Sequence, residues 1–152
     1  MKKILFLLVL ALASVAVNAQ DLVKQDDGKY YQNEQLFTGN FKTYHNNGQI
    51  ASDRNFDNGI ENGISMYYHD NGMKKEARAY TDGFKDGVWT TWNLKGQKTA
   101  EARYQRDLKH GKWMIYGDNG QARYEMHYDQ GEKVGKWYMW DENGKLLSEK
   151  QY

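Results

Sequence analysis

The sequence predicts an all-β fold, an elongated antiparallel β-meander built from repeats after an N-terminal signal peptide. Five glycines recur at a constant spacing of 24 residues, at Gly39, Gly63, Gly87, Gly111 and Gly135. With each of these glycines counted as position 1, position 10 is again glycine, and positions 6 and 18 are always aromatic. A fixed period of this length indicates a repeat architecture. Turn signals recur about every twelve residues, which leaves no room for a helix of ordinary length.

The first residues have the layout of an export signal. Two lysines precede an apolar run over residues 4–17, and small residues lead to Ala19. This order of charged, apolar and small segments predicts a signal peptide over residues 1–19, cleaved before Gln20. The apolar run is shorter than the ~20 residues that a membrane-spanning helix needs. We therefore expect an exported protein, periplasmic or secreted, with no stable membrane insertion after cleavage.

The composition excludes several classes of function. Lys and Arg number 21 against 20 Asp and Glu, and removal of the signal's two lysines leaves 19 basic residues and a net charge near −1. A near-neutral chain lacks the electrostatic footprint of a nucleic-acid-binding protein. Cysteine is absent, so neither a disulfide nor a thiolate metal site can form. Cohesion must come from packing, for which five Trp and twelve Tyr supply large apolar areas.

After the signal, the chain divides into a cap and five repeats. Residues 20–38 form the N-terminal cap, which reads as a half-repeat. The repeats then cover residues 39–152 without an insertion, at 39–62, 63–86, 87–110, 111–134 and 135–152.

Each repeat is predicted to fold as two antiparallel strands joined by a tight hairpin. Position 9 is Asn in four repeats, and the Asn-Gly dipeptide is favoured in two-residue hairpins, where both central residues have positive φ. Lys95-Gly96 is the weaker variant. The predicted hairpin tips are residues 47–48, 71–72, 95–96, 119–120 and 143–144.

A second turn is expected near position 21, where Asp, Asn and Gly gather. It covers residues 57–59, 81–83 and 129–131, and Arg106-Asp107 stands at this place in the third repeat. The segments between the two turns are rich in Trp, Tyr, Thr and Met, as strands are.

The aromatic positions predict ladders of rings along the sheet. Equivalent residues of successive repeats lie about 10 Å apart when two strands separate them. Trp89, Trp113 and Trp137 at position 3 should form one ladder, and the aromatic residues at positions 6 and 18 should form others. Positions 3 and 6 differ in parity, so in a regular strand they face opposite sides. Either both faces of the sheet carry aromatic ladders, or a bulge near the leading glycine rotates one of them.

These residues carry a resemblance to a known family. The pattern G-x-W-x-x-Y/W-x-x-N-G, followed by E-x-x-Y and D-G-x-x-x-G, resembles the MORN repeat in its bacterial 24-residue variant. The clearest matches run over residues 111–120 and 135–144, whereas Phe41 and Ser65 depart from the pattern at position 3. Residues 28–39 are similar to the half-repeat that opens such arrays. The resemblance implies an elongated, twisted sheet of MORN-type repeats that serves as a binding or assembly surface, and many bacterial members are labelled antitoxin-like.

The sequence argues against catalysis, and we expect no enzyme, cofactor or metal site. His45 and His69 share position 7, but a separation of about 10 Å prevents them from sharing one ion. Glutamates recur at position 15, at Glu101, Glu125 and Glu149, again too far apart for the paired carboxylates of a glycosidase. A structural role is expected for them, pairing with Arg103, Arg123 or Lys150. An active site also needs unlike groups that converge on one point, which a repeated ladder does not supply.

Two functions remain, and the first is a protein-binding scaffold. In this interpretation a partner protein, or a second copy of the chain, binds a face or an edge of the sheet, with an antitoxin-like or immunity-like role as one form of it. In the alternative, exposed aromatic ladders bind a glycan in the periplasm or outside the cell. Trp92 and Trp140 are expected to be partly exposed, because Tyr replaces Trp at position 6 elsewhere. The candidate binding surface contains Trp92, Trp137, Trp140 and Tyr152.

Overall fold

The computed structural model describes residues 21–152, and the predicted signal peptide over residues 1–19 lies outside the described residues. The described chain is a long antiparallel β-meander without a helix, and the sheet is not closed, which confirms the predicted fold class. In this part of the chain there is accordingly no helix long and apolar enough to cross a membrane.

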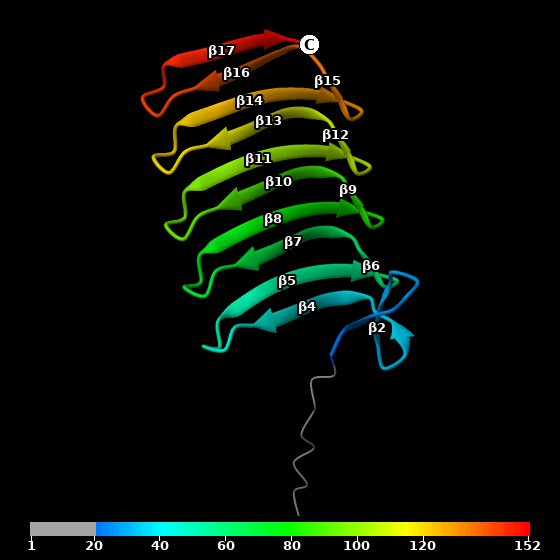
Figure 1. Ribbon diagram of the computed structural model, residues 1–152. Helices are drawn as coiled ribbons and strands as arrows, with labels where there is room; N and C mark the ends of the chain where they lie inside the picture. Colours follow the sequence, from blue (N-terminus) through cyan, green and yellow to red (C-terminus); the bar gives the residue numbers. More distant parts are fainter. Residues whose placement is uncertain (1–20) are drawn as a thin grey trace, which may run out of the picture.

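Five hairpins stack along one axis to form the main sheet (Figure 1). Their strands are β4 (Gly39–Tyr44) and β5 (Ile50–Asp57), β7 (Gly63–Tyr68) and β8 (Lys74–Thr81), β10 (Gly87–Trp92) and β11 (Lys98–Gln105), β13 (Gly111–Tyr116) and β14 (Ala122–Asp129), and β16 (Lys136–Trp140) and β17 (Leu146–Gln151). Four two-residue strands lie between the hairpins: β6 (Ile60–Glu61), β9 (Phe84–Lys85), β12 (Leu108–Lys109) and β15 (Glu132–Lys133). The cap contributes β1 (Val23–Lys24), β2 (Tyr30–Gln32) and β3 (Gln35–Leu36) as a separate small sheet.

The hairpin tips lie at the predicted dipeptides, but the predicted turn type is wrong. In the first tip the His45 carbonyl accepts a hydrogen bond from Gly48 N at 2.9 Å, and the Gln49 carbonyl accepts one from His45 N at 2.8 Å. Gly48 has φ +82°, whereas Asn47 is not among the residues with positive φ. This pattern is a type I turn closed by a left-handed glycine, not a two-residue turn with two positive φ values. The Asn47 carboxamide oxygen instead accepts a hydrogen bond from Gln49 N.

The two-residue turns with two positive φ values lie at the opposite end of the hairpins, near position 21. Asn58 and Gly59 have φ +48° and +78°, and the flanking residues Asp57 and Ile60 pair directly. The third repeat keeps the same geometry without glycine, because Arg106 and Asp107 have φ +47° and +69°. These turns end each second strand and reverse the chain into the short strand that follows.

Each hairpin pairs with the next over a short stretch, and this makes the strands curve apart. Between β8 and β10 two residue pairs are in register, Ala77 with Thr90 and Glu76 with Thr91. Beyond them β8 pairs with β9 instead, and Asp86 N donates to the Ala79 carbonyl at 3.1 Å. The turns near position 21 consequently form a column of their own along one side of the sheet (Figure 1).

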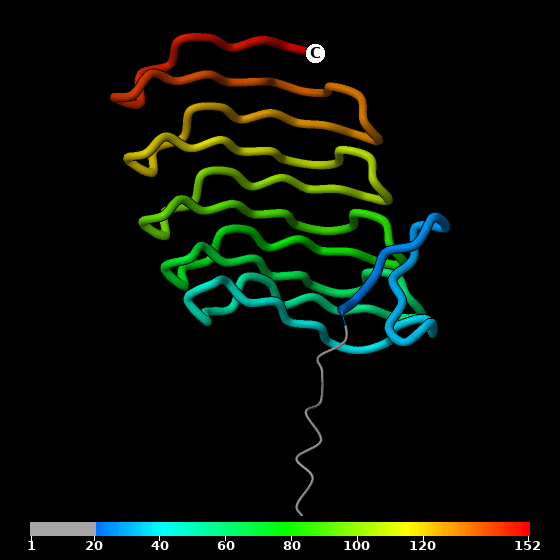
Figure 2. Tube along the Cα trace, turned by 60° about the horizontal axis from the view of Figure 1, so that its bottom comes forward, coloured from blue at the N-terminus to red at the C-terminus, as the bar shows by residue number. Residues whose placement is uncertain are grey.

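The cap adds one more layer to this column. Gly59 N donates to the Phe37 carbonyl at 2.7 Å, and Tyr30 N donates to the Gly59 carbonyl at 2.8 Å. The first of these bonds repeats the contact of Gly83 N with the Glu61 carbonyl one repeat later. Figure 2 shows the cap beside the turn column and away from the hairpin tips. The cap thus packs onto the first turn of this column through backbone hydrogen bonds.

The register places aromatic residues on both faces of the sheet. Within a hairpin, position 3 opposes position 16 and position 5 opposes position 14, as in Trp89 with Ala102 and Thr91 with Ala100. Position 6 lies on the other face, and the irregularity falls between Thr91 and Trp92, next to the tip. Of the two alternatives left by the sequence, the structure thus has ladders on both faces, and the bulge is not at the leading glycine. We call the side of positions 3, 5, 14, 16 and 18 the ladder face.

Two glycines with the same backbone conformation should respond differently to alanine. Gly120 has φ +78° and nothing within 4 Å of the place that a Cβ would take, so Gly120→Ala should lose about 1 kcal/mol through backbone strain alone. At Gly59, also at φ +78°, an added Cβ would lie 2.8 Å from the Tyr30 carbonyl oxygen and 2.7 Å from a Leu36 methyl. Gly59→Ala should therefore lose about 1 kcal/mol more, measured as free energy of unfolding in urea. Equal losses would show that the cap does not pack against this turn in solution.

Candidate binding surface

A continuous ladder of rings runs along the ladder face from the second repeat to the fifth. Trp at position 3 alternates with Tyr at position 18 of the preceding and the same repeat. Neighbouring ring centroids lie 4.6–5.3 Å apart, within the range of favourable tilted and edge-to-face contacts. The rings in order are Tyr80, Trp89, Tyr104, Trp113, Tyr128, Trp137 and Tyr152.

Each tryptophan of the ladder is also fixed by a hydrogen bond to the repeat before it. Trp89 Nε1 donates to the Ala79 carbonyl at 2.9 Å, and Trp137 Nε1 donates to the His127 carbonyl at 3.0 Å. Trp113 makes the equivalent bond to the Arg103 carbonyl. These acceptors all stand at position 17, where the second strand leaves the main sheet, so the indole satisfies a carbonyl at the repeat boundary.

A lysine at position 23 covers two rings in each of three successive layers. Lys85 Nζ lies 4.9 Å from the Trp89 ring and 5.2 Å from the Tyr104 ring. Lys109 covers Trp113 and Tyr128 in the same way, and Lys133 covers Trp137 and Tyr152, at 4.7–5.0 Å. These distances are within reach of cation–π attraction. The sequence interpretation did not identify these lysines, although their 24-residue spacing is visible in the sequence.

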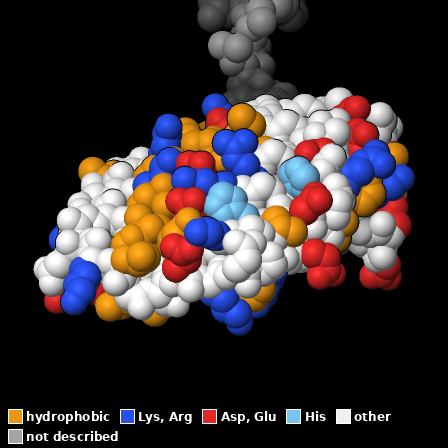
Figure 3. Space-filling view, turned by 90° about the horizontal axis from the view of Figure 1, so that it is seen from above, with side chains coloured by type: hydrophobic (Ala, Val, Ile, Leu, Met, Phe, Trp, Pro, Cys, Tyr) orange, Lys and Arg blue, Asp and Glu red, His pale blue; other side chains and the backbone are white. Residues whose placement is uncertain are grey.

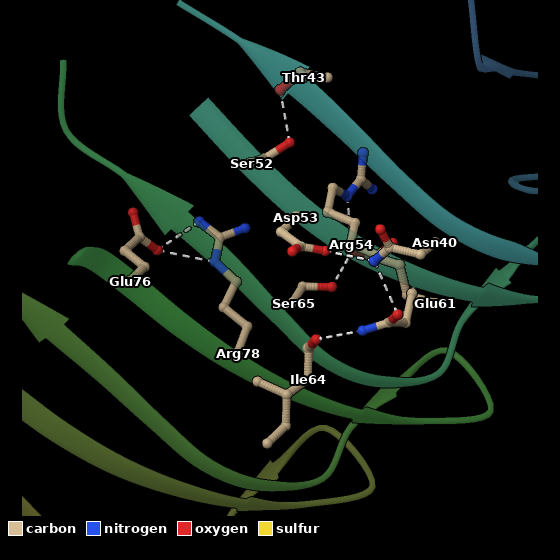
Figure 4. A network of polar contacts seen from close by, with 11 residues as sticks. Asn40, Thr43, Ser52, Asp53, Arg54, Glu61, Ile64, Ser65, Glu76 and Arg78 are labelled. Carbon is tan, nitrogen blue, oxygen red and sulfur yellow. Dashed lines mark hydrogen bonds and ion pairs between the residues drawn. The ribbon is translucent and has the colours of Figure 1, made fainter. Parts of the chain in front are cut away.

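The ladder is interrupted in the second repeat, where Ser65 replaces tryptophan. Ser65 is 1% exposed, and its hydroxyl donates to Glu61 Oε1 at 3.1 Å. Glu61 occupies the position that lysine has in later repeats, and Arg54 Nε donates to the same oxygen at 3.0 Å (Figure 4). The Arg54 guanidinium lies 4.8 Å from the Phe56 ring. A half-buried ion pair with a hydroxyl partner therefore fills the space of the missing ring.

A second arginine completes this polar cluster. The Arg78 guanidinium lies 4.3 Å from the Tyr67 ring and 5.3 Å from the Trp89 ring, and it donates to Glu76 at 2.6 Å. Burial alone would lower the pKa of Arg54, but its hydrogen bonds to Glu61 and Tyr30 outweigh burial and raise it. The cluster is thus held as paired charges rather than as a free cationic site.

The character of the ladder face changes along the sheet. In the first repeat Thr43 and Ser52 pair through their hydroxyls at 2.7 Å, and the second repeat places Glu76 and Arg78 on this face. At the same positions the fourth repeat carries Ile115, Tyr124 and Met126, and the fifth carries Met139 beside Ser148 and Lys150. The ladder face is therefore polar at one end and more apolar around the fourth hairpin and Met139.

The apolar end contains two adjoining hollows. One, of about 320 Å³, is lined mainly by Tyr124, Met126, Trp137 and Met139, with Lys150 and Tyr152 at its margin. The other, of about 370 Å³, shares Tyr124 and Met139 but lies toward the last hairpin tip, where Arg123, Asp141 and Glu142 line it together with Trp140 and Leu147. Tyr124 is 43% exposed and Leu147 56% exposed, so large apolar side chains face solvent here. Seen from the β17 end, hydrophobic side chains form patches between basic and acidic ones (Figure 3).

The four residues predicted as a binding surface do not form one surface. Trp137 and Tyr152 are neighbours in the ladder, with ring centroids 4.6 Å apart. Trp140 lies on the opposite face, where it stacks on Tyr138 at 5.6 Å and 21°. Trp92 also lies on that face, below Lys74 at 5.9 Å. All five tryptophans are half-buried, so position 6 is not distinguished by greater exposure.

The repeated glutamates lie on the charged face opposite the ladder, and their predicted ion-pair partners are wrong. Each glutamate forms its ion pair with a lysine, and not with Arg103, Arg123 or Lys150 as expected. The pairs are Glu101 with Lys98 at 2.7 Å, Glu125 with Lys112 at 3.0 Å, and Glu149 with Lys136 at 2.6 Å. Partial burial alone would raise the pKa of Glu125, but hydrogen bonds from His127 and Lys112 outweigh it and lower the pKa.

The histidines at position 7 have structural roles. His45 Nε2 lies 3.0 Å from the Tyr68 carbonyl, and His69 Nε2 lies 3.0 Å from the Trp92 carbonyl, so each links its tip to the next repeat. Among residues 21–152 no group of three or more His, Asp or Glu side chains is arranged to hold a metal ion.

Comparison with known families agrees with the period of the structure. The family model described as "MORN repeat variant" matches residues 37–58, 109–130 and 133–152. The starts of the first two matches are three 24-residue periods apart, and the third begins one period after the second. The unmatched second and third repeats nevertheless form hairpins of the same register. No curated protein matches the chain.

Ionisation of a half-buried ladder tyrosine should weaken the fold at high pH. Burial, together with Glu61 and Tyr67, raises the pKa of Tyr80 to about 12. An unfolded tyrosine ionises near pH 10, so between about pH 10 and 12 the unfolded state binds fewer protons and stability falls as the pH rises. Tyr80→Phe should lose less stability over this interval than the wild type, measured by urea midpoints. Tyr44→Phe, at a ring that is 61% exposed, is the control. Identical pH profiles for all three proteins would contradict this assignment.

Proposed function

Because the chain is a MORN-repeat protein, we propose that it is a binding scaffold whose partner is an apolar segment of another protein. Repeats of this family are generally non-catalytic modules, which is consistent with a scaffold. The observation that carries the proposal is the change along the ladder face from hydroxyl and charged residues to Ile115, Tyr124, Met126 and Met139.

The physical reason lies in what the architecture requires of each position. Positions 3 and 18 hold the repeats together, and they are aromatic throughout except at Ser65. In the last two repeats no second sheet or helix of the described chain packs on positions 5, 14 and 16, because the small sheet of the cap lies at the first repeat. Apolar side chains there gain nothing from exposure to water, and contiguous exposed apolar surface is typical of interaction sites.

The hollows at this end suit an inserted side chain better than a small-molecule ligand. They are open and shallow, and they lie side by side with Met139 and Tyr124 between them. Methionine adapts its shape to a partner, and exposed tyrosine supplies contact area at low entropic cost. We place the partner on the last two repeats, and we propose that the protein acts after export. An antitoxin-like or immunity-like role is one form that this binding could take.

Glycan binding is the second candidate, and one observation favours it. On the opposite face Tyr138 and Trp140 stack nearly parallel, and such flat aromatic pairs suit sugar rings. The ladder itself is less suited to sugars, because its rings contact neighbouring rings on two sides and Lys85, Lys109 and Lys133 cover them.

The scaffold proposal predicts that position 5 matters at one end of the sheet and not at the other. A photo-crosslinking amino acid in place of Met139 should yield adducts with a different protein in the producing cell. One in place of Thr43 should yield no such adduct, and adducts between two copies of the chain, identified by their mass, are counted separately. Once the adduct is identified, Met139→Glu should weaken its binding at least tenfold, a loss of about 1.4 kcal/mol. Thr43→Glu, at the same repeat position, should leave binding unchanged.

The same variants separate the two candidate functions. The absence of protein adducts at residue 139, together with glycan-array binding that Trp140→Ala abolishes, would overturn the scaffold proposal in favour of the glycan candidate. Circular dichroism of each variant verifies that the sheet is intact.

A further inference from the structure

The main sheet has two outer edges without a partner strand in the described chain, the outer side of β4 and the outer side of β17. We propose that β17 of one copy of the chain pairs with β4 of a second copy, so that copies join head to tail. This inference does not rest on the proposed function, because it uses the edges of the sheet and not the ladder face.

The junction that would form already occurs inside the chain. Between consecutive hairpins, positions 14 and 15 of one repeat pair with positions 5 and 4 of the next, as in Ser52 with Tyr67 and Asp53 with Met66. The same register recurs at every later boundary. At the free ends, β17 presents Ser148 and Glu149, and β4 presents Thr43 and Lys42. The two edges are therefore the two halves of one repeated junction.

The charges at these edges favour this pairing. Glu149 pairs with Lys136 at 2.6 Å, and Lys42 pairs with Asp53 at 3.5 Å, all on the charged face. In the register of the internal junctions, Glu149 lies directly opposite Lys42 of the second copy, and the signs alternate across the joined strands. A symmetric antiparallel pairing of β17 with β17 centred on residue 149 places Glu149 opposite Glu149, and like charges directly opposite are destabilising.

The hairpin tips supply a matching contact. The Asn47 carboxamide donates to the Asp70 carbonyl at 2.6 Å, a bond from position 9 to position 8 of the next repeat. Asn71 and Asn119 repeat it at 3.0 Å. In a joined pair the corresponding bond runs from Asn143 to the Asn46 carbonyl of the second copy.

Apolar contact is also available beside the tips. Tyr44 at position 6 is 61% exposed and Leu146 at position 12 is 47% exposed, and these two positions meet across the repeat boundary inside the chain, where Lys74 lies over Trp92. The cap does not cover the tip half of β4 (Figures 1 and 2). Each added copy repeats the step between internal repeats and leaves one free edge at each end, so longer chains of copies form at higher concentration.

Charge exchange tests the pairing. The chain is purified from cells that express the full-length sequence, and its association is followed by sedimentation velocity. Glu149→Lys and Lys42→Glu should each reduce association at least tenfold. A mixture of the two variants should restore it, because every junction between unlike variants again brings a basic side chain opposite an acidic one. A wild type that stays monomeric at every accessible concentration, or a mixture that fails to associate, would overturn the proposal.

Crosslinking gives a second, independent test, and the lack of native cysteine gives it a clean background. Ser148→Cys and Thr43→Cys proteins, mixed and oxidised, should form a disulfide between the two variants. The control is Ala100→Cys with Ile115→Cys in one chain, an internal pair at the same two positions that should close within the chain. A disulfide between two Ser148→Cys chains in preference to the mixed product would show symmetric pairing and refute the head-to-tail arrangement.

Discussion

The carbonyl at position 17 is the point on which the stacking of repeats depends. There the second strand of a hairpin leaves the main sheet, and its carbonyl loses the strand partner that a flat meander would provide. The Ala79 carbonyl accepts one hydrogen bond from Asp86 N and another from the Trp89 indole, which belongs to the next repeat. One carbonyl acceptor thus fixes both the path of the backbone into the next repeat and the position of the tryptophan ring. The 24-residue period follows, because a different spacing would move the indole away from this carbonyl.

The second repeat shows how the ladder tolerates the loss of a ring. Removal of the indole at Ser65 leaves space for a large side chain and removes a hydrogen-bond donor. Arg54 and Glu61 fill the space as an ion pair, and Phe56 stacks with Tyr30 and Phe37 of the cap instead of with a tryptophan. A lysine at residue 61 would leave Arg54 without its carboxylate, and two like charges side by side at these half-buried positions are costly. Serine at residue 65 and glutamate at residue 61 therefore belong together, and they divide the aromatic packing into a short N-terminal part and a long C-terminal part.

The sequence predicted the all-β repeat fold because the 24-residue period, the recurring glycines and the turn dipeptides all indicated the same unit, one hairpin in each repeat. It predicted the wrong turn type at Asn47-Gly48, because an Asn-Gly pair also suits a type I turn in which the asparagine side chain bonds two residues ahead. It left the face of Trp140 relative to Trp137 open, because a pattern of residue types does not show whether a bulge lies near the leading glycine; the structure has its irregularity between Met139 and Trp140 instead. The lysines that cover the ladder could have been found, since Lys85, Lys109 and Lys133 share one position of the repeat. Their spacing alone, however, does not show which face of the sheet their side chains contact.

The repeats keep a constant length of 24 residues while the polarity of some positions varies, and the one-dimensional stacking of the repeats explains why. Each repeat contacts only its neighbours, so cohesion is supplied at every boundary by the same few positions, and these cannot change independently. Positions 5 and 14 contact one another across a hairpin but carry no boundary bond through their side chains, so Thr43 with Ser52 and Met139 with Ser148 serve equally well in the fold. Polarity can therefore vary from one end of the sheet to the other at little cost in stability. At the two free edges of the sheet the backbone cannot select a partner, because it offers the same N–H and C=O groups as the strands at every internal repeat boundary. The choice of the strand that pairs with an edge therefore depends on side chains such as Lys42 and Glu149.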